Sequence, residues 1–128
     1  NDALATDEHG NHVPPRHHLL LYLDYSGEGT PTGDDRDRVE AALRSLERAF
    51  ARSSDGLLFT VGYAPAYFER FDAALPDSVD LPAPEPLAPF EDPALDESDA
   101  VVHLASDAGS ALLAAEAVLR RFSGSAPV

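Results

Sequence analysis

The sequence contains no cysteine and no lysine. Without cysteine the chain can form no disulfide, thiolate metal site or cysteine nucleophile. Its nine basic residues are all arginine and stand against 23 acidic residues, which gives a net charge of −14. Such a surface repels nucleic-acid phosphates and anionic lipids, so we expect neither as a partner. No apolar run approaches the roughly 20 residues of a membrane span.

The charge imbalance predicts a protein from a salt-loving organism. Self-repulsion at this net charge opposes the compact state unless salt screens it. Disorder is the other reading of a high net charge, but an apolar content of 44% favours a folded core. The chain begins with Asn1 rather than Met, so we expect that an upstream segment was removed. A signal sequence is one candidate, and the protein would then be exported to the cell surface or beyond.

Three apolar segments predict strands, and two segments with an apolar stripe predict helices. The expected strands are "HLLLYLDY" (18–25), "LLFTVGY" (57–63) and "DAVVHLAS" (99–106). The expected helices are 34–53, with a stripe of Val39, Leu43, Leu46 and Phe50, and 107–122, with a stripe of Leu112, Ala115, Leu119 and Phe122. Thr32 is a plausible N-cap for the first helix, with Asp35 three residues on. A short helix is expected in 64–71, with Pro65 in its first turn.

The chain divides into a polar arm and one incomplete half-domain. Residues 1–17 form the arm, which carries histidines and has a stop at Pro14 and Pro15. Residues 18–128 form the half-domain, with a proline-rich connection over 75–98.

The order of elements predicts an α+β, ferredoxin-like fold. That fold is βαββαβ, an antiparallel sheet with its helices on one face, and here the last strand is missing. A missing strand leaves an open sheet edge. The strands are also apolar on both faces, whereas two helices cover only one. We therefore expect a C-terminal half or another chain to cover the second face; the alternative is that "SGSAPV" (123–128) adds a short strand and the face stays half-exposed.

The histidines are the main candidates for chemistry. His9 and His12 are three apart, with acidic neighbours that could add oxygen ligands, a donor set that suits zinc or copper. Gly10, however, favours a turn, and a pair near a terminus is usually solvated, so an arm that docks on the missing half is the alternative. His17 and His18 are adjacent and should point to opposite faces of a strand, which makes joint ligation of one ion difficult.

The other polar candidates have simpler structural explanations. His103 lies within the third strand and is expected to be a hydrogen-bonded interior or interface residue, although a place near a cofactor edge is possible. Asp107 is expected to cap the following helix, and Asp99 lies at a strand end, where carboxylates are sometimes catalytic. No EF-hand, GxSxG or P-loop pattern occurs, so no catalytic residue is assigned.

Two stretches resemble the N-terminal part of the dye-decolorizing peroxidases. They are "GLLFTVGYAPAYFERF" and "LAPFEDPALDESDAVVHLASDAGSALLAAEAVLRRF", with Val61-Gly62-Tyr63, Tyr67 to Arg70 and Asp99 to Asp107 at the motif positions. The likeness covers most of 18–122 and is closest to exported haloarchaeal relatives, which agrees with the acidic, lysine-free composition.

The resemblance implies a ferredoxin-like half that packs against a second such half. In the family the second half binds haem through a histidine below the iron, and a GxxDG aspartate and an arginine handle peroxide. Here "SSDG" (53–56) lacks the first glycine, so no catalytic residue can be carried over and any haem would be bound by the missing half. The sequence therefore predicts the scaffold part of a peroxidase-like oxidoreductase. The alternative is a non-catalytic binding or structural module that pairs through its open sheet into a homo-oligomer or filament.

Overall fold

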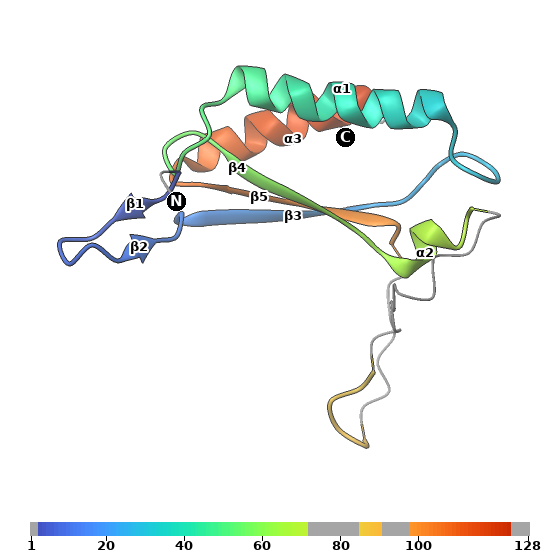
Figure 1. Cartoon of the computed structure of the whole chain (residues 1–128), viewed down its shortest axis with the longest axis horizontal. Helices are drawn as coiled ribbons and strands as arrows, with labels where there is room; N and C mark the ends of the chain where they lie inside the picture. Colours follow the sequence, from blue (N-terminus) through green and yellow to red (C-terminus); the bar gives the residue numbers. More distant parts are fainter. Residues whose placement is uncertain (1–2, 72–84, 91–97, 124–128) are drawn as a thin grey trace.

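The predicted α+β class is confirmed. A computed structural model describes residues 3–71, 85–90 and 98–123. It contains a three-stranded antiparallel sheet with two long helices on one face (Figure 1). Most of the proline-rich connection and residues 124–128 lie outside the described residues, and so does the suggested strand in "SGSAPV".

The sheet has the strand order expected for a ferredoxin-like half. Its strands are β3 (His17–Leu23), β4 (Leu58–Tyr63) and β5 (Ala100–Ser106), and β5 pairs antiparallel with both of the others. The strands β3 and β4 are therefore parallel to each other, with β5 inserted between them. The register with β5 is continuous on both sides, so Gly62 lies within regular strand pairing and causes no bulge.

Each helix begins within two residues of its predicted start, and the first two helices end earlier than predicted. Helix α1 (Gly33–Ala49) starts with a complete capping box between Thr32 and Asp35. It ends four residues earlier than expected: the Phe50 N–H still donates to the Leu46 carbonyl, as in a helix, but the backbone of Phe50 is already extended. Helix α2 (Pro65–Phe68) is one turn long, and α3 (Gly109–Ser123) returns across the sheet.

The core lies between the sheet and the two long helices. Leu46 from α1 and Leu104 from β5 are fully buried, and Val102, Leu112 and Ala115 pack with them. Val39, which the sequence placed on the apolar stripe of α1, is 46% exposed. The buried face of α1 starts one turn later, at Ala42.

The arm contains a small hairpin. Strands β1 (Ala5–Thr6) and β2 (His12–Val13) pair antiparallel and project beyond the end of the sheet (Figure 1). Gly10 closes the turn at a φ of 81°, in the left-handed region that glycine tolerates. The arm is fixed to the domain where the Ser54 amide donates to the Ala3 carbonyl. None of the helices in the described part of the chain is long and apolar enough to span a bilayer.

Candidate functional site

The face of the sheet turned away from the helices is the first candidate site. Side chains alternate along a strand, so the register assigns nine positions to this surface, which we call the open face. They are His18, Leu20 and Tyr22 from β3, Val101, His103 and Ala105 from β5, and Leu58, Thr60 and Gly62 from β4.

The open face is partly apolar and lacks carboxylates and guanidinium groups. None of its nine positions holds an acidic residue or an arginine, although the whole chain has a net charge of −14. Leu20 is 50% exposed and Tyr22 is 66% exposed, whereas Leu104 on the opposite face is completely buried. The described residues therefore leave an apolar strip open to solvent, as expected from strands that are apolar on both faces.

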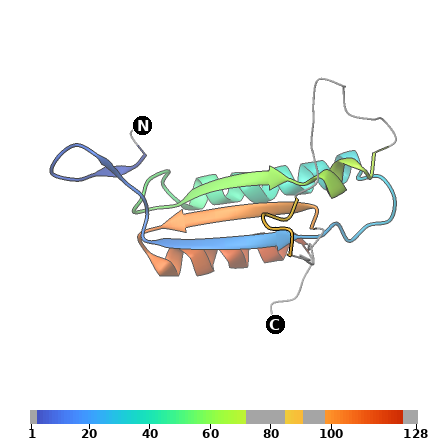
Figure 2. The same ribbon diagram turned by 90° about the horizontal axis from the view of Figure 1, so that it is seen from below.

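The segment 85–90 lies on the same side of the sheet. It is drawn far from the helices in Figure 1 and in front of the sheet in Figure 2, which looks onto the molecule from below. Its two large apolar side chains, Leu87 and Phe90, are at least 90% exposed. The side of the molecule without helices thus presents two separate apolar elements.

Two histidines meet on the open face. His18 Nδ1 lies 2.9 Å from His103 Nε2, and the rings stack with their centroids 5.1 Å apart. His18 Nε2 lies 2.9 Å from the carbonyl oxygen of Pro15. The expectation that His103 is hydrogen-bonded is confirmed. Its partner was missed, because only the β3–β5 register reveals that residues 85 positions apart are neighbours.

The sequence predicted that His17 and His18 point to opposite faces of a strand, and the structure shows this arrangement. His18 faces the open side, whereas the His17 ring lies near Gly109 at the start of α3. His17 and His18 therefore do not share a site.

In the described part of the chain, no third ligand joins the arm histidines His9 and His12. His9 lies in the turn between β1 and β2, with its Nε2 3.5 Å from Glu8 Oε1, and both side chains are well exposed. The nearby Asp7 carboxylate is used by the turn, since it accepts from the amides of His9 and Asn11. Among the described residues there is no group of three or more histidine or acidic side chains placed to hold an ion. A metal site at His9 and His12 stays a sequence prediction.

An ion pair between a buried carboxylate and a partly exposed arginine lies at the opposite end of the sheet. Asp99, just before β5, is 3% exposed and accepts hydrogen bonds from Arg70 Nε at 2.6 Å and Nη2 at 3.1 Å. It also accepts from the backbone amide of Tyr25 at 2.7 Å. The Arg70 guanidinium carbon lies 5.4 Å from the centre of the Tyr25 ring. This pair joins the end of β3, the segment after α2 and the start of β5.

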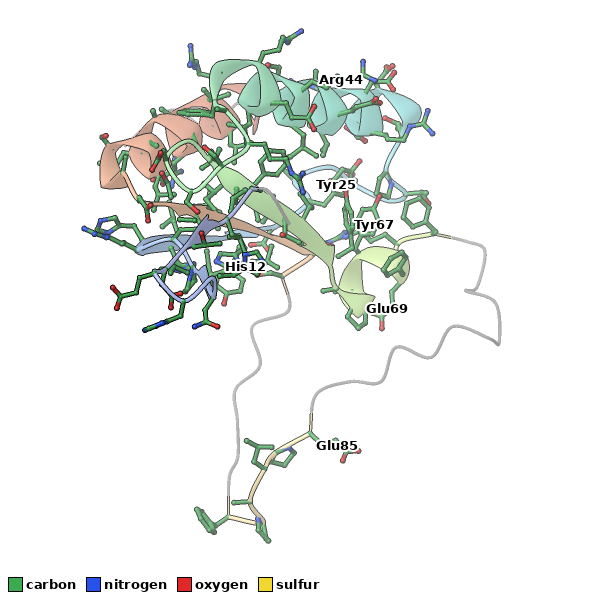
Figure 3. The ribbon with its side chains drawn as sticks, turned by 60° about the vertical axis from the view of Figure 1, so that its left-hand side comes forward. His12, Tyr25, Arg44, Tyr67, Glu69 and Glu85 are labelled. Carbon is green, nitrogen blue, oxygen red and sulfur yellow. The ribbon has the colours of Figure 1, made fainter. Side chains whose placement is uncertain are left out.

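The same network continues into the start of α1. Tyr25 donates its hydroxyl to Asp35, the carboxylate that also accepts from the Thr32 amide in the capping box. Hydrogen bonds from Thr32 and Tyr25 lower the pKa of Asp35, and the bond to Asp35 raises the pKa of Tyr25. Hydrogen bonding to Arg70 lowers the pKa of Asp99. Figure 3 shows Tyr25 and Tyr67 together between α1 and α2, away from His12.

The Asp99 network is structural in character. A buried carboxylate that three donors, two of them from a guanidinium, hold in its ionised form is a poor proton acceptor. Aromatic rings pack beside it, with Tyr67 4.7 Å from Tyr63 and 5.2 Å from Phe71 between ring centres. The sequence identified Asp99 only as a strand-end carboxylate, because its partner Arg70 is separated from it by 29 positions.

Asp107 has a different partner from the one expected. Its Oδ1 accepts from the backbone amide of Arg16 at 3.0 Å, so it attaches the arm to the domain. The amide of Ala108 is satisfied instead by Ser106 Oγ, which itself donates to the Gly56 carbonyl. The two side chains thus fix the β5–α3 turn against the arm and the loop before β4.

Comparisons with known proteins give one match. No curated protein and no solved structure matches the sequence. One family model, described as a family of unknown function, matches residues 15–125, which include all three strands of the main sheet and the helices α1, α2 and α3. The chain therefore belongs to the family of unknown function DUF7405.

Proposed function

We propose that this chain is the non-catalytic scaffold portion of a haem-binding, dye-decolorizing-peroxidase-like protein from a halophile. Its role is to supply one α+β layer whose open face packs against a second ferredoxin-like half. The resemblance to exported haloarchaeal proteins extends the proposal to an exported protein. The exposure of Leu20 and Tyr22 on the open face is the observation that carries the proposal.

The fold supports this role. The order β3–β5–β4, with α1 and α3 on one face, is that of a ferredoxin-like half without its fourth strand, which would lie beside β3. A covering layer would bury the apolar strip without enclosing a carboxylate or a guanidinium group, because the open face carries no acidic residue or arginine. The acidic residues, which keep a halophilic surface hydrated, occupy none of the positions of this face.

The chain's own residues do not fit haem. In "SSDG" (53–56) the Ser53 hydroxyl accepts from the Gly56 amide, so these residues form a tight turn after α1. A Cβ at Gly56 would collide with the Ala51 carbonyl, which explains the glycine without any ligand. The proposal therefore assigns haem to the partner half and derives no catalytic step from the residues present here.

The alternative is a binding or structural module that pairs with further copies of itself. The free edges favour it, since within the described residues no strand pairs with the outer edge of β3 or of β4. Unpaired strand edges accept added strands from another chain. Under this alternative the open face or the β3 edge forms a dimer or filament and no haem is involved.

Absorption spectroscopy of the natural protein distinguishes the two. The full natural polypeptide, produced with haem available, should show a Soret band, and its intact mass should extend past Val128. A polypeptide that ends at Val128, self-associates and shows no Soret band after haem is added contradicts the peroxidase-like proposal.

Paired variants then test whether the open face makes the contact. Leu20→Arg places a charge on the open face, whereas Leu113→Arg places one on α3, where the side chain is 67% exposed. Leu20→Arg should disrupt association with the second half or with further copies, and Leu113→Arg should leave it intact. Equal effects of the two variants would exclude the open face as the contact surface.

A further inference from the structure

We propose that His18 and His103 form a two-histidine binding site for a cupric ion on the open face. The two rings come from adjacent antiparallel strands, and the nitrogens that face each other are 2.9 Å apart. This inference does not depend on haem or on a second half, because both ligands belong to this chain.

The Pro15 carbonyl determines which His18 nitrogen is available. A carbonyl oxygen only accepts, so His18 Nε2 carries the proton that makes the 2.9 Å bond to Pro15. In the neutral ring His18 Nδ1 is then unprotonated and directs a lone pair toward His103. Histidine ligands in metal sites commonly donate their second ring nitrogen to a backbone carbonyl in this way, which fixes both tautomer and orientation.

The second ligand is His103 Nε2. Without an ion it donates its proton to His18 Nδ1, and with an ion its neutral ring takes the tautomer protonated at Nδ1. The ion then replaces the hydrogen bond: it lies to one side of the line between the two nitrogens, and the rings rotate so that both lone pairs point at it. Both rings stay neutral and no residue changes its net charge.

Two imidazole nitrogens as ligands favour copper. Two metal–nitrogen bonds of about 2.0–2.1 Å that meet at a right angle place their nitrogens about 2.9 Å apart, whereas a tetrahedral angle places them about 3.3 Å apart. The observed 2.9 Å is the length of the hydrogen bond between the two rings, so the nitrogens need to move little to take neighbouring positions of a tetragonal site, the geometry that Cu²⁺ prefers with imidazole ligands. Cu²⁺ also binds nitrogen sites more tightly than Ni²⁺ or Zn²⁺.

The surroundings leave space for the remaining ligands. His18 and His103 line a hollow of about 680 Å³ between the arm, the sheet and the end of α1, and the charged side chains Glu47 and Arg52 belong to the same lining. In the part of the chain that the structure describes, no third histidine or acidic side chain joins the pair, so water or an external ligand would fill the other positions. The net charge of −14 raises the local concentration of cations.

Calorimetric titration with Cu²⁺ alone tests the site on the full chain. We expect one saturable site, and electron paramagnetic resonance should show coupling to two imidazole nitrogens. His103→Gln and His18→Gln should each weaken binding about tenfold or more. The matched control is the double variant of His9→Gln and His12→Gln, which removes the arm histidines and should leave the affinity unchanged.

The proposal is overturned if the arm double variant abolishes binding, or if folded His103→Gln binds Cu²⁺ as the wild type does. Should His103→Gln fail to fold by circular dichroism, paramagnetic broadening in the wild-type chain decides. Sub-stoichiometric Cu²⁺ should broaden the ring signals of His18 and His103 first, and broadening of the His9 and His12 signals alone contradicts the site.

Discussion

Two leucines on opposite faces of the sheet allow a quantitative test of where the core lies. Leu104 is completely buried in the middle of β5, between Leu19 and Phe59 in the register. Leu20, on the neighbouring strand, points to the open face and is 50% exposed. The same change, leucine to alanine, thus removes the same atoms from two environments in one sheet.

The structure gives different magnitudes for the two variants. Leu104→Ala removes fully buried atoms and leaves a cavity under the helices, which should cost about 3 kcal/mol of unfolding free energy. Leu20→Ala removes a half-exposed side chain and creates no closed cavity, so its cost should be about 1 kcal/mol. For a domain of this size these values correspond to losses in melting temperature of about 10 °C and about 3 °C.

Urea unfolding followed by circular dichroism measures both values, with Leu113→Ala on the exposed side of α3 as a control expected within about 0.5 kcal/mol of wild type. If Leu20→Ala costs as much as Leu104→Ala in dilute solution, the open face is buried within the chain itself and the reasoning is refuted. If its cost rises only with protein concentration, a second copy covers the face.

Two further predictions concern charge. Because Arg70 lowers the pKa of Asp99, the ionised Asp99 stabilises the fold above the unfolded pKa of about 3.8, and this contribution is lost as the pH falls below that value. Asp99→Asn should therefore melt below wild type at neutral pH, with a difference that narrows in thermal melts below about pH 3.8; a constant difference would mean that the charge of Asp99 does not matter. The melting temperature of the chain should also rise between about 0.1 M and about 1 M salt, as screening weakens the repulsion among 23 acidic residues. A melting temperature that does not change with salt would remove the argument for a halophilic protein.

The elements were largely predictable because their signals are local. The β-strand segments are apolar runs, and the capping box at Thr32 is a three-residue pattern that the structure reproduces. The end of α1 was less predictable, since the stripe of apolar residues continues through Phe50 although the backbone there is already extended. Helix ends depend on the path that the chain takes next, which local periodicity does not contain.

The candidate sites were less predictable than the elements. The sequence offered His9 and His12 as a candidate metal site because they are close in sequence. In the structure the hairpin turn leaves them exposed and without a third ligand among the described residues. His18 and His103, which do meet, lie 85 positions apart. Asp107 was expected to cap α3 and instead holds the arm through Arg16.

The amino-acid sequence alone determined the charge, the acidic and lysine-free surface, the kinds of elements and their order, because these depend on composition and on the spacing of neighbouring residues. Only the tertiary structure decided which strand lies between the other two, which of their faces is left open, and that His18 meets His103 while Arg70 meets Asp99. The physical reason is that strand register and helix placement are set by the burial of the whole core. A shift of one residue would turn every strand side chain to the opposite face, and no local pattern records that choice.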